Sequence, residues 1–230
     1  AQLYIQSFVN GFELFYAPIE DRVILGLLPS YLERQDSSLV YMVDHFIKKS
    51  KNPESGFYLN DLQALQATIK DLEAREKKYV LIGVSFALLD LAEMGPLKIS
   101  NGIVMETGGM KGRRKELIRS ELHQALQKSF GPIAIHSEYG MTELLSQAYS
   151  KGNGLFNAPP WMKVLTSQPN DPFKYINGQT GGVSIIDLAN YYSCSFIATQ
   201  DLGKVYPDGS FEILGRFDQS DLRGCNLMVF

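Results

Sequence analysis

The chain has 230 residues, with 22 basic and 25 acidic side chains and a formal net charge of −3. This mild acidity argues against a nucleic-acid partner, because proteins that hold phosphate backbones usually carry a basic excess. A hydrophobic share of 45% and a charged share of 20% exclude wholesale disorder. No stretch approaches the roughly 20 uninterrupted apolar residues of a membrane helix, so we expect no membrane span.

The cysteine and histidine content favours a cytoplasmic protein without structural zinc. Cys194 and Cys225 are too few for a disulfide framework in a chain of this length, so both thiols are expected to be free. Cys194 lies in an aromatic run, which favours a buried position. The histidines lie too far apart in the sequence for zinc spacing: His45, His123 and His136.

The first part of the chain alternates between strand and helix patterns. Helical spacing of apolar residues predicts helices around 39–47, 62–72 and 118–126, the first capped by Asp36 or Ser37 and the second by Asn60 or Asp61. Short apolar runs without alternation predict strands covered on both faces, at 23–28, 79–84, 103–105 and 133–135. This order predicts a parallel sheet with right-handed crossovers.

After about residue 155 the pattern changes, because prolines punctuate the chain and helical periodicity fades. Short β-prone runs remain at 162–165, 182–186, 195–198, 210–214 and 227–229. Residues 207–209 (Pro-Asp-Gly) predict a hairpin turn. The expected fold class is α/β, with parallel-sheet α/β layers at 1–155 followed by a β-rich C-terminal subdomain at 156–230.

One motif follows the predicted strand 133–135, where an open α/β sheet places its ligands: Tyr139, Gly140, Met141, Thr142 and Glu143. A threonine hydroxyl can bond a phosphate oxygen, a glutamate can bind Mg²⁺, and a tyrosine ring can cover a base. The alternative is a glycine turn that opens a helix, with the threonine as its cap and the glutamate in its first turn.

A second candidate segment follows the strand 103–105. Gly108 and Gly109 would allow close approach of the backbone to a ligand. The basic residues at 111–115 lead into a predicted helix, where positive charge opposes the dipole; this indicates either a bound anion or a solvated basic turn. The glycines match neither a dinucleotide-binding fingerprint nor a Walker loop.

The C-terminal part carries two further candidates. Asp201 and Arg216, a strand-end carboxylate and a guanidinium framing a hairpin, could hold a ribose diol from two sides. The alternatives are a turn at 201–203 and a surface ion pair between Arg216 and Asp218. Cys225 is either a small buried hydrophobic residue or a thiolate nucleophile whose pKa is lowered by Arg223.

Taken together, four segments in this order resemble the adenylate-forming superfamily of acyl- and aryl-CoA synthetases and luciferases: 139–143, 201, 215–218 and 223–224. The similarity is greatest to the LuxE-type acyl-protein synthetases, where the ending GR-x-D-x-S-D-x-RGC also occurs. It runs from about residue 102 to the end of the chain and is looser upstream.

The resemblance implies roles for the candidate residues. Thr142 would contact the α-phosphate of ATP, and Glu143 would bind Mg²⁺. Asp201, helped by Arg216, would take the ribose hydroxyls, and Cys225 would accept the acyl group. The remaining nucleotide-binding candidates are Gly108, Gly109, Tyr139 and Gly140, around the adenine and the acyl group.

The implied reaction joins a carboxylic acid, in this type a fatty acid, to AMP and then transfers the acyl group to a protein thiol. An acyl-accepting or reductase protein would be the partner. The superfamily's Ser/Thr/Gly-rich phosphate loop and its C-terminal lid have no match here, so the resemblance implies an N-terminally truncated fold of low adenylation activity. Two alternatives stay open: a non-catalytic nucleotide-binding or interaction module, and an AMP-forming acyl- or aryl-CoA ligase.

Overall fold

The computed structural model describes residues 2–28, 37–108 and 117–217, which form two compact units. Unit 1 spans Ala1–Gly154 and unit 2 spans Leu155–Phe230. Gly109 and Cys225 lie outside the described residues, as do the basic segment 111–115 and the predicted strand 227–229.

Unit 1 contains the predicted parallel sheet. Its described strands follow the order β2-β1-β3-β4-β5-β6, and all neighbours are parallel except β5 and β6, which are antiparallel. The strands are β1 (Val23–Leu27), β2 (Gly56–Phe57), β3 (Tyr79–Val84), β4 (Gly102–Thr107), β5 (Ile135–Tyr139) and β6 (Ala148–Ser150). β1 and β3 are buried along their whole length, which explains their continuous apolar sequence.

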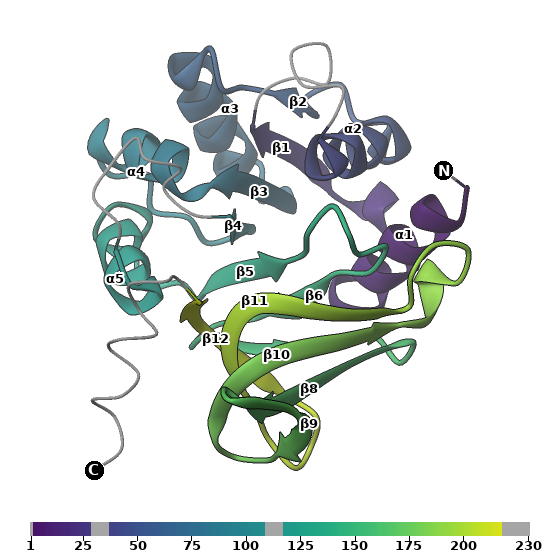
Figure 1. Ribbon diagram of the computed structural model, residues 1–230. Helices are drawn as coiled ribbons and strands as arrows, with labels where there is room; N and C mark the ends of the chain where they lie inside the picture. The colour runs from purple at the N-terminus through teal and green to yellow at the C-terminus, as the bar shows by residue number, and fades with distance from the viewer. Residues whose placement is uncertain (1, 29–36, 109–116, 218–230) are drawn as a thin grey trace. The chain divides into compact units, whose positions relative to one another are not determined.

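Three helices of unit 1 match the predicted pattern: α2 (Ser38–Ser50), α3 (Leu62–Ala74) and α5 (Arg119–Phe130). The predicted caps are present, because Ser37 accepts from the amide of Val40 and Asp61 from that of Ala64. The structure adds α1 (Gln2–Tyr16), the short helix η1 (Ile19–Asp21) and α4 (Ser85–Glu93). Figure 1 shows α1 and α2 on one side of the sheet and α3, α4 and α5 on the other.

The position of β5 differs from the prediction. The strand begins at Ile135, where the predicted run ends, and continues to Tyr139. Its buried and partly exposed residues alternate, because Ser137 faces α5 whereas His136 and Glu138 face the side of α1. An apolar-run criterion misses such a strand, since its middle is polar.

Unit 2 is the expected β-rich part, with described strands in the order β7-β12-β11-β10-β8-β9, the paired neighbours being antiparallel. The predicted turn at 207–209 joins β11 to β12, where the Gly209 amide donates to the Tyr206 carbonyl. The strands are β7 (Leu155–Asn157), β8 (Met162–Gln168), β9 (Asp171–Ile176), β10 (Thr180–Asp187), β11 (Phe196–Val205) and β12 (Phe211–Arg216), with the short helix η2 (Leu188–Asn190) between β10 and β11.

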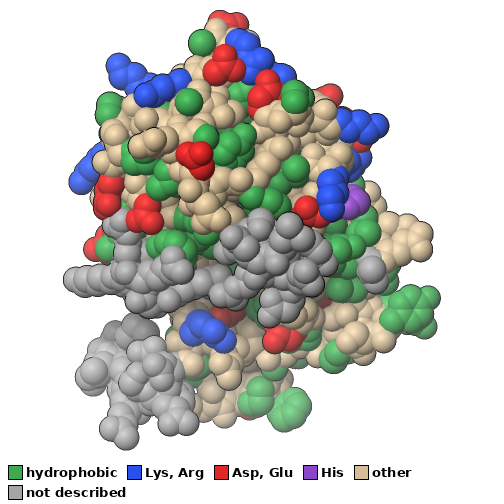
Figure 2. Space-filling view, turned by 90° about the horizontal axis from the view of Figure 1, so that it is seen from above, with side chains coloured by type: hydrophobic (Ala, Val, Ile, Leu, Met, Phe, Trp, Pro, Cys, Tyr) green, Lys and Arg blue, Asp and Glu red, His purple; other side chains and the backbone are tan. Residues whose placement is uncertain are grey.

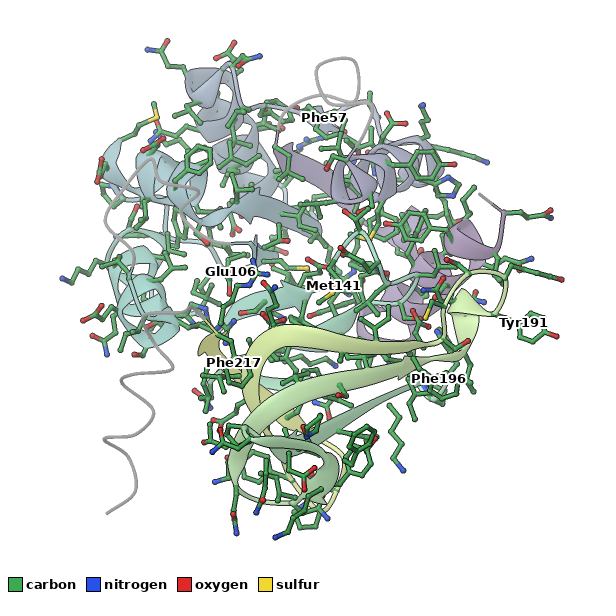
Figure 3. All side chains as sticks on the ribbon, viewed as in Figure 1. Phe57, Glu106, Met141, Tyr191, Phe196 and Phe217 are labelled. Carbon is green, nitrogen blue, oxygen red and sulfur yellow. The ribbon has the colours of Figure 1, made fainter. Side chains whose placement is uncertain are left out.

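The expectation that Cys194 is buried is wrong. The thiol is exposed, in the connection between β10 and β11. Its aromatic neighbours are exposed as well, with Tyr191 at 74% and Phe196 at 72% of full exposure, and both side chains project from the end of this hairpin (Figure 3). An aromatic run therefore does not define a core position here.

The surface agrees with the composition. On the face shown in Figure 2, basic and acidic side chains are interspersed over the described residues, in keeping with the net charge of −3. Among the described helices, none is both long enough and apolar enough to cross a membrane.

Candidate functional site

The carboxyl ends of β4 and β5 bring two predicted residues, Gly108 and Tyr139, together in unit 1. Thr107 and Glu138 are register partners, so Gly108 and Tyr139, the next residues of parallel strands, are neighbours. Gly108 has a φ of +64°, and a Cβ at this position would meet no atom within 4 Å. The hydroxyl of Ser85 donates to its carbonyl at 2.7 Å. The edge therefore offers a fixed backbone with open space above it.

Thr142 and Glu143 lie in a turn between β5 and β6, where the Leu144 amide donates to the Met141 carbonyl at 3.1 Å. Both side chains are exposed. The alternative of a helix opened by this motif is wrong, because the chain continues through the turn into β6. Figure 3 labels Met141 beyond the end of β5. The turn keeps a hydroxyl and a carboxylate at the carboxyl edge of the sheet, available to solvent.

A buried charged cluster lies on the α5 side of this edge. Glu106, in β4 (labelled in Figure 3), is 6% exposed, and Arg119 Nε donates to its Oε1 at 3.2 Å. His123 Nε2 lies 3.8 Å from the same oxygen and 3.5 Å from Ser137 Oγ. Burial alone would raise the pKa of Glu106, but His123, Ser137 and the Arg119 charge together lower it. The cluster fixes the start of α5 to β4.

The opposite face of the edge carries a second carboxyl group, which sequence analysis missed. The hydroxyl of Thr107 donates to Glu138 Oε2 at 2.5 Å. Burial and the nearby Glu106 carboxylate, opposed in part by the Thr107 hydrogen bond, raise the pKa of Glu138 to about 7. The only sequence signal was its place directly before Tyr139, in a strand whose polar residues hid it.

His136, which lies next to the candidate motif, packs against α1. Its Nδ1 lies 3.1 Å from the hydroxyl of Tyr16 on α1, and burial, reinforced by the charges of Lys151 and His123, lowers its pKa to about 4. The imidazole is therefore neutral at physiological pH and packs between β5 and α1.

In unit 2 the structure brings Asp201 and Arg216 together. They are register partners on β11 and β12, and Arg216 Nε lies 3.6 Å from Asp201 Oδ1. Asp201 is 8% exposed and its amide donates to Thr199 Oγ1, whereas the Arg216 side chain is largely exposed and also donates to Gln200 Oε1. Asp201 lies in the middle of β11 rather than at a strand end, and the pair stands at the open end of the hairpin.

The residues present fit a nucleotide with Mg²⁺. The described residues contain no group of three His, Cys, Asp or Glu side chains placed to hold a metal ion. Mg²⁺ does not require one, because it commonly takes one or two carboxylates together with substrate phosphates and water. The exposed carboxylate of Glu143 suits this role, and the open backbone at Gly108 leaves room for a planar base.

Comparison with known proteins gives matches among solved structures. No family model matches the sequence, and a search of the curated proteins gives no match. ATP-bound MatB from Rhodopseudomonas palustris is 19% identical with a TM-score of 0.67, and the match covers 94% of this chain and 44% of that one. O-succinylbenzoate coenzyme A synthetase (MenE) from Bacillus subtilis, in complex with ATP and magnesium, is 15% identical with a TM-score of 0.60, over 93% and 45%.

A luciferase-like enzyme from the mealworm Zophobas morio is 13% identical with a TM-score of 0.64, covering 94% of this chain and 54% of that one. The chain therefore shares its fold with these three structures over most of its length, and the expected α/β architecture is confirmed. It spans about half the length of the structures it matches.

Proposed function

We propose that this chain belongs to an ATP-dependent ligase that activates a carboxylic acid as acyl-adenylate and passes the acyl group to a protein thiol. The observation that carries the proposal is the carboxyl edge of unit 1, which brings Gly108, Tyr139, Thr142 and Glu143 together in the fold of adenylate-forming enzymes. The LuxE-type ending, a fatty acid as substrate and an acyl-accepting or reductase protein as partner come from the sequence resemblance. Use of Mg·ATP agrees with a cytoplasmic setting.

In this proposal the residues of unit 1 bind and orient the α-phosphate. The Thr142 hydroxyl donates to an α-phosphate oxygen, and Tyr139 with Gly108 borders the adenine. Glu143 would hold Mg²⁺, which offsets the negative charge that builds up on the phosphate during attack by the acid. The second half of the reaction forms a thioester bond and breaks the acyl–phosphate bond, with AMP as leaving group.

In unit 2, Asp201 would accept hydrogen bonds from both ribose hydroxyls. The backbone of Asp201 is held by the hydrogen bond from its amide to Thr199 Oγ1, and its carboxylate lies beside the guanidinium of Arg216. Because the Arg216 side chain is largely exposed, a bound nucleotide could also contact its guanidinium.

Calorimetric titration with AMP and MgCl₂ tests the nucleotide site. We expect Asp201→Ala to weaken binding by about tenfold or more, since it removes hydrogen bonds to a charged group. Asp171→Ala, an exposed carboxylate of the same unit, is the control and should bind as the wild type does. Equal affinity of Asp201→Ala and the wild type would contradict the ribose assignment.

Labelling with a preformed acyl-adenylate tests the thiol. Decanoyl-AMP should add one acyl group at Cys225, and Cys225→Ser should abolish it. Cys194→Ser is the matched control, because Cys194 is the exposed thiol among the described residues. Labelling that survives Cys225→Ser shows that Cys225 is not the acceptor.

A further inference from the structure

A cluster of polar groups lies on the α1 side of β5 and β6, away from the α5 side that carries Glu106. Glu138 and Tyr149 are register partners across the two strands. Gln147 lies directly before β6, and its side chain approaches Gly140 together with that of Glu138. Thr107, on β4, completes the cluster through its hydrogen bond to Glu138. The cluster therefore combines three side chains from adjacent strands with one from the connection that leads into β6.

Two of these groups have unmet hydrogen-bonding capacity. Gln147 is 4% exposed and Tyr149 is 1% exposed. Among the described residues, the amide oxygen of Gln147 and the hydroxyl of Tyr149 have no hydrogen-bond partner. An unpaired buried polar atom is destabilising, so such atoms usually meet a ligand or an ordered water.

The cluster reaches the candidate site at Gly140. A Cβ on this glycine would lie 2.5 Å from Glu138 Oε1 and 3.3 Å from Gln147 Cγ, so both side chains approach the backbone there. Gly140 lies two residues before Thr142, which would contact the α-phosphate. A group bound by the cluster would therefore be close to the carboxylate that is being activated.

The side chains of the cluster favour a ligand that donates hydrogen bonds. A Gln147 amide oxygen only accepts, a Glu138 carboxylate only accepts, and the Tyr149 hydroxyl can do either. Burial raises the pKa of Tyr149 above its ordinary value, so it remains a neutral hydroxyl. A plain hydrocarbon chain would leave the Gln147 amide oxygen and the Tyr149 hydroxyl unsatisfied.

We propose that Glu138, Gln147 and Tyr149 form a subsite for a hydroxyl or amino group on carbon 2 or 3 of the carboxylic acid substrate. This inference rests on the proposed function and deepens it by naming the substrate class. A site built around hydrogen-bond acceptors discriminates against the analogue that lacks the donor, because the acceptors then stay buried and unpaired.

The pH dependence of binding distinguishes an amino group on the substrate, which is positively charged, from a neutral hydroxyl group. Burial holds the pKa of Glu138 at about 7, so its carboxylate form gains population between pH 6 and pH 8. An ammonium ligand should bind more tightly over this interval, whereas a hydroxyl should change little. The titratable groups that surround Glu138 are Glu106 on β4, His136 on β5, Tyr149 on β6, and Tyr4 and Tyr16 on α1.

Calorimetric titration of the full chain with 3-hydroxydecanoate, 3-aminodecanoate and decanoate, at pH 6 and pH 8 with AMP and MgCl₂ present, tests the proposal. We expect at least one of the two substituted acids to bind about tenfold more tightly than decanoate. Glu138→Gln, which preserves shape, and Gln147→Leu should each abolish this preference. Glu76→Gln, an exposed residue before β3 at the other edge of the sheet, is the control and should retain it.

The wild-type comparison keeps the proposal falsifiable even if a variant fails to fold. Equal responses of the wild type to the three acids, including no response, overturn the subsite. A preference that persists in both Glu138→Gln and Gln147→Leu overturns the assignment of these residues. Failure of the proposed function is a different result, namely no nucleotide binding by the wild type in the AMP titration.

Discussion

Glu138 and His136 lie two residues apart on the same face of β5, and burial shifts their pKa values in opposite senses. The pKa of Glu138 rises from 4.5 to about 7, whereas that of His136 falls from 6.5 to about 4. Both shifts favour the neutral form, as expected for two groups that share one partly buried face with the aromatic side chains of α1. Near pH 7 Glu138 is therefore present as both carboxyl and carboxylate, whereas His136 is neutral.

The two shifts predict opposing pH effects on the free energy of unfolding. Between pH 4.5 and 7 the folded state binds more protons at Glu138 than the unfolded state does, so Glu138 lowers stability as the pH rises. Between pH 4 and 6.5 the unfolded state binds more protons at His136, so His136 raises stability as the pH rises. We expect Glu138→Gln to gain stability over the wild type by about 3 kcal/mol at pH 8, with little difference below pH 4.5.

Urea denaturation of both proteins across pH 4 to pH 8 measures this difference. Subtracting the wild-type curve removes the contribution of carboxylates that both proteins share. His136→Asn provides the converse comparison, since it should be relatively more stable than the wild type at pH 4 than at pH 7. A Glu138→Gln difference that does not change with pH would contradict the raised pKa.

At the scale of elements, two glycines of the β11–β12 hairpin differ in the space available for a side chain. A Cβ at Gly203 would lie 2.5 Å from the backbone oxygen of Glu212 and 2.7 Å from Val183, whereas one at Gly215 would meet no atom within 4 Å. The register of β11 against β12 also shifts beside Gly203. This irregularity separates the hairpin turn from the Asp201–Arg216 pair.

We therefore expect Gly203→Ala to destabilise the hairpin by about 3 kcal/mol, because backbone must move to admit the methyl group. Gly215→Ala is the matched control on the same hairpin, and its stability should stay within about 0.5 kcal/mol of the wild type. Thermal unfolding followed by circular dichroism gives both values. Equal tolerance of the two substitutions would show that β11 does not pass this close to β12.

Sequence patterns predicted elements where one periodicity dominated. The amphipathic spacing of α2 and α3, and the unbroken apolar run of β3, each had one interpretation. α4 was missed because it is buried on nearly all sides and so shows no polar face. β5 was misplaced because its polar middle residues find partners on other elements, which no local pattern reveals.

The candidate site was predictable only in part, for the same reason. Motif order indicated Thr142, Glu143 and Asp201, and the structure places Asp201 beside Arg216 across β11 and β12. Glu138 and Gln147 belong to no motif. Their common feature is an approach to Gly140, Glu138 from β5 and Gln147 from the connection before β6, which appears only when the sheet is assembled.

At the scale of the whole molecule, the apolar core is concentrated in unit 1. Its buried residues run from Phe8 to Tyr149 and include most of β1 and β3, whereas unit 2 has a small core around the stacked rings of Phe156 and Phe211. Free energy from burial grows with the apolar area removed from water, so we expect unit 1 to be the more stable unit.

This difference predicts that the two units open separately in native-state hydrogen exchange. Gly203→Ala should accelerate exchange in β10, β11 and β12 and leave β3 and β4 protected. Ile82→Ala, which truncates a side chain in β3 that is 1% exposed, should cost about 2–5 kcal/mol and accelerate exchange across unit 1. If either substitution accelerates both units equally, the chain unfolds as one cooperative body, and the division at Gly154 has no energetic counterpart.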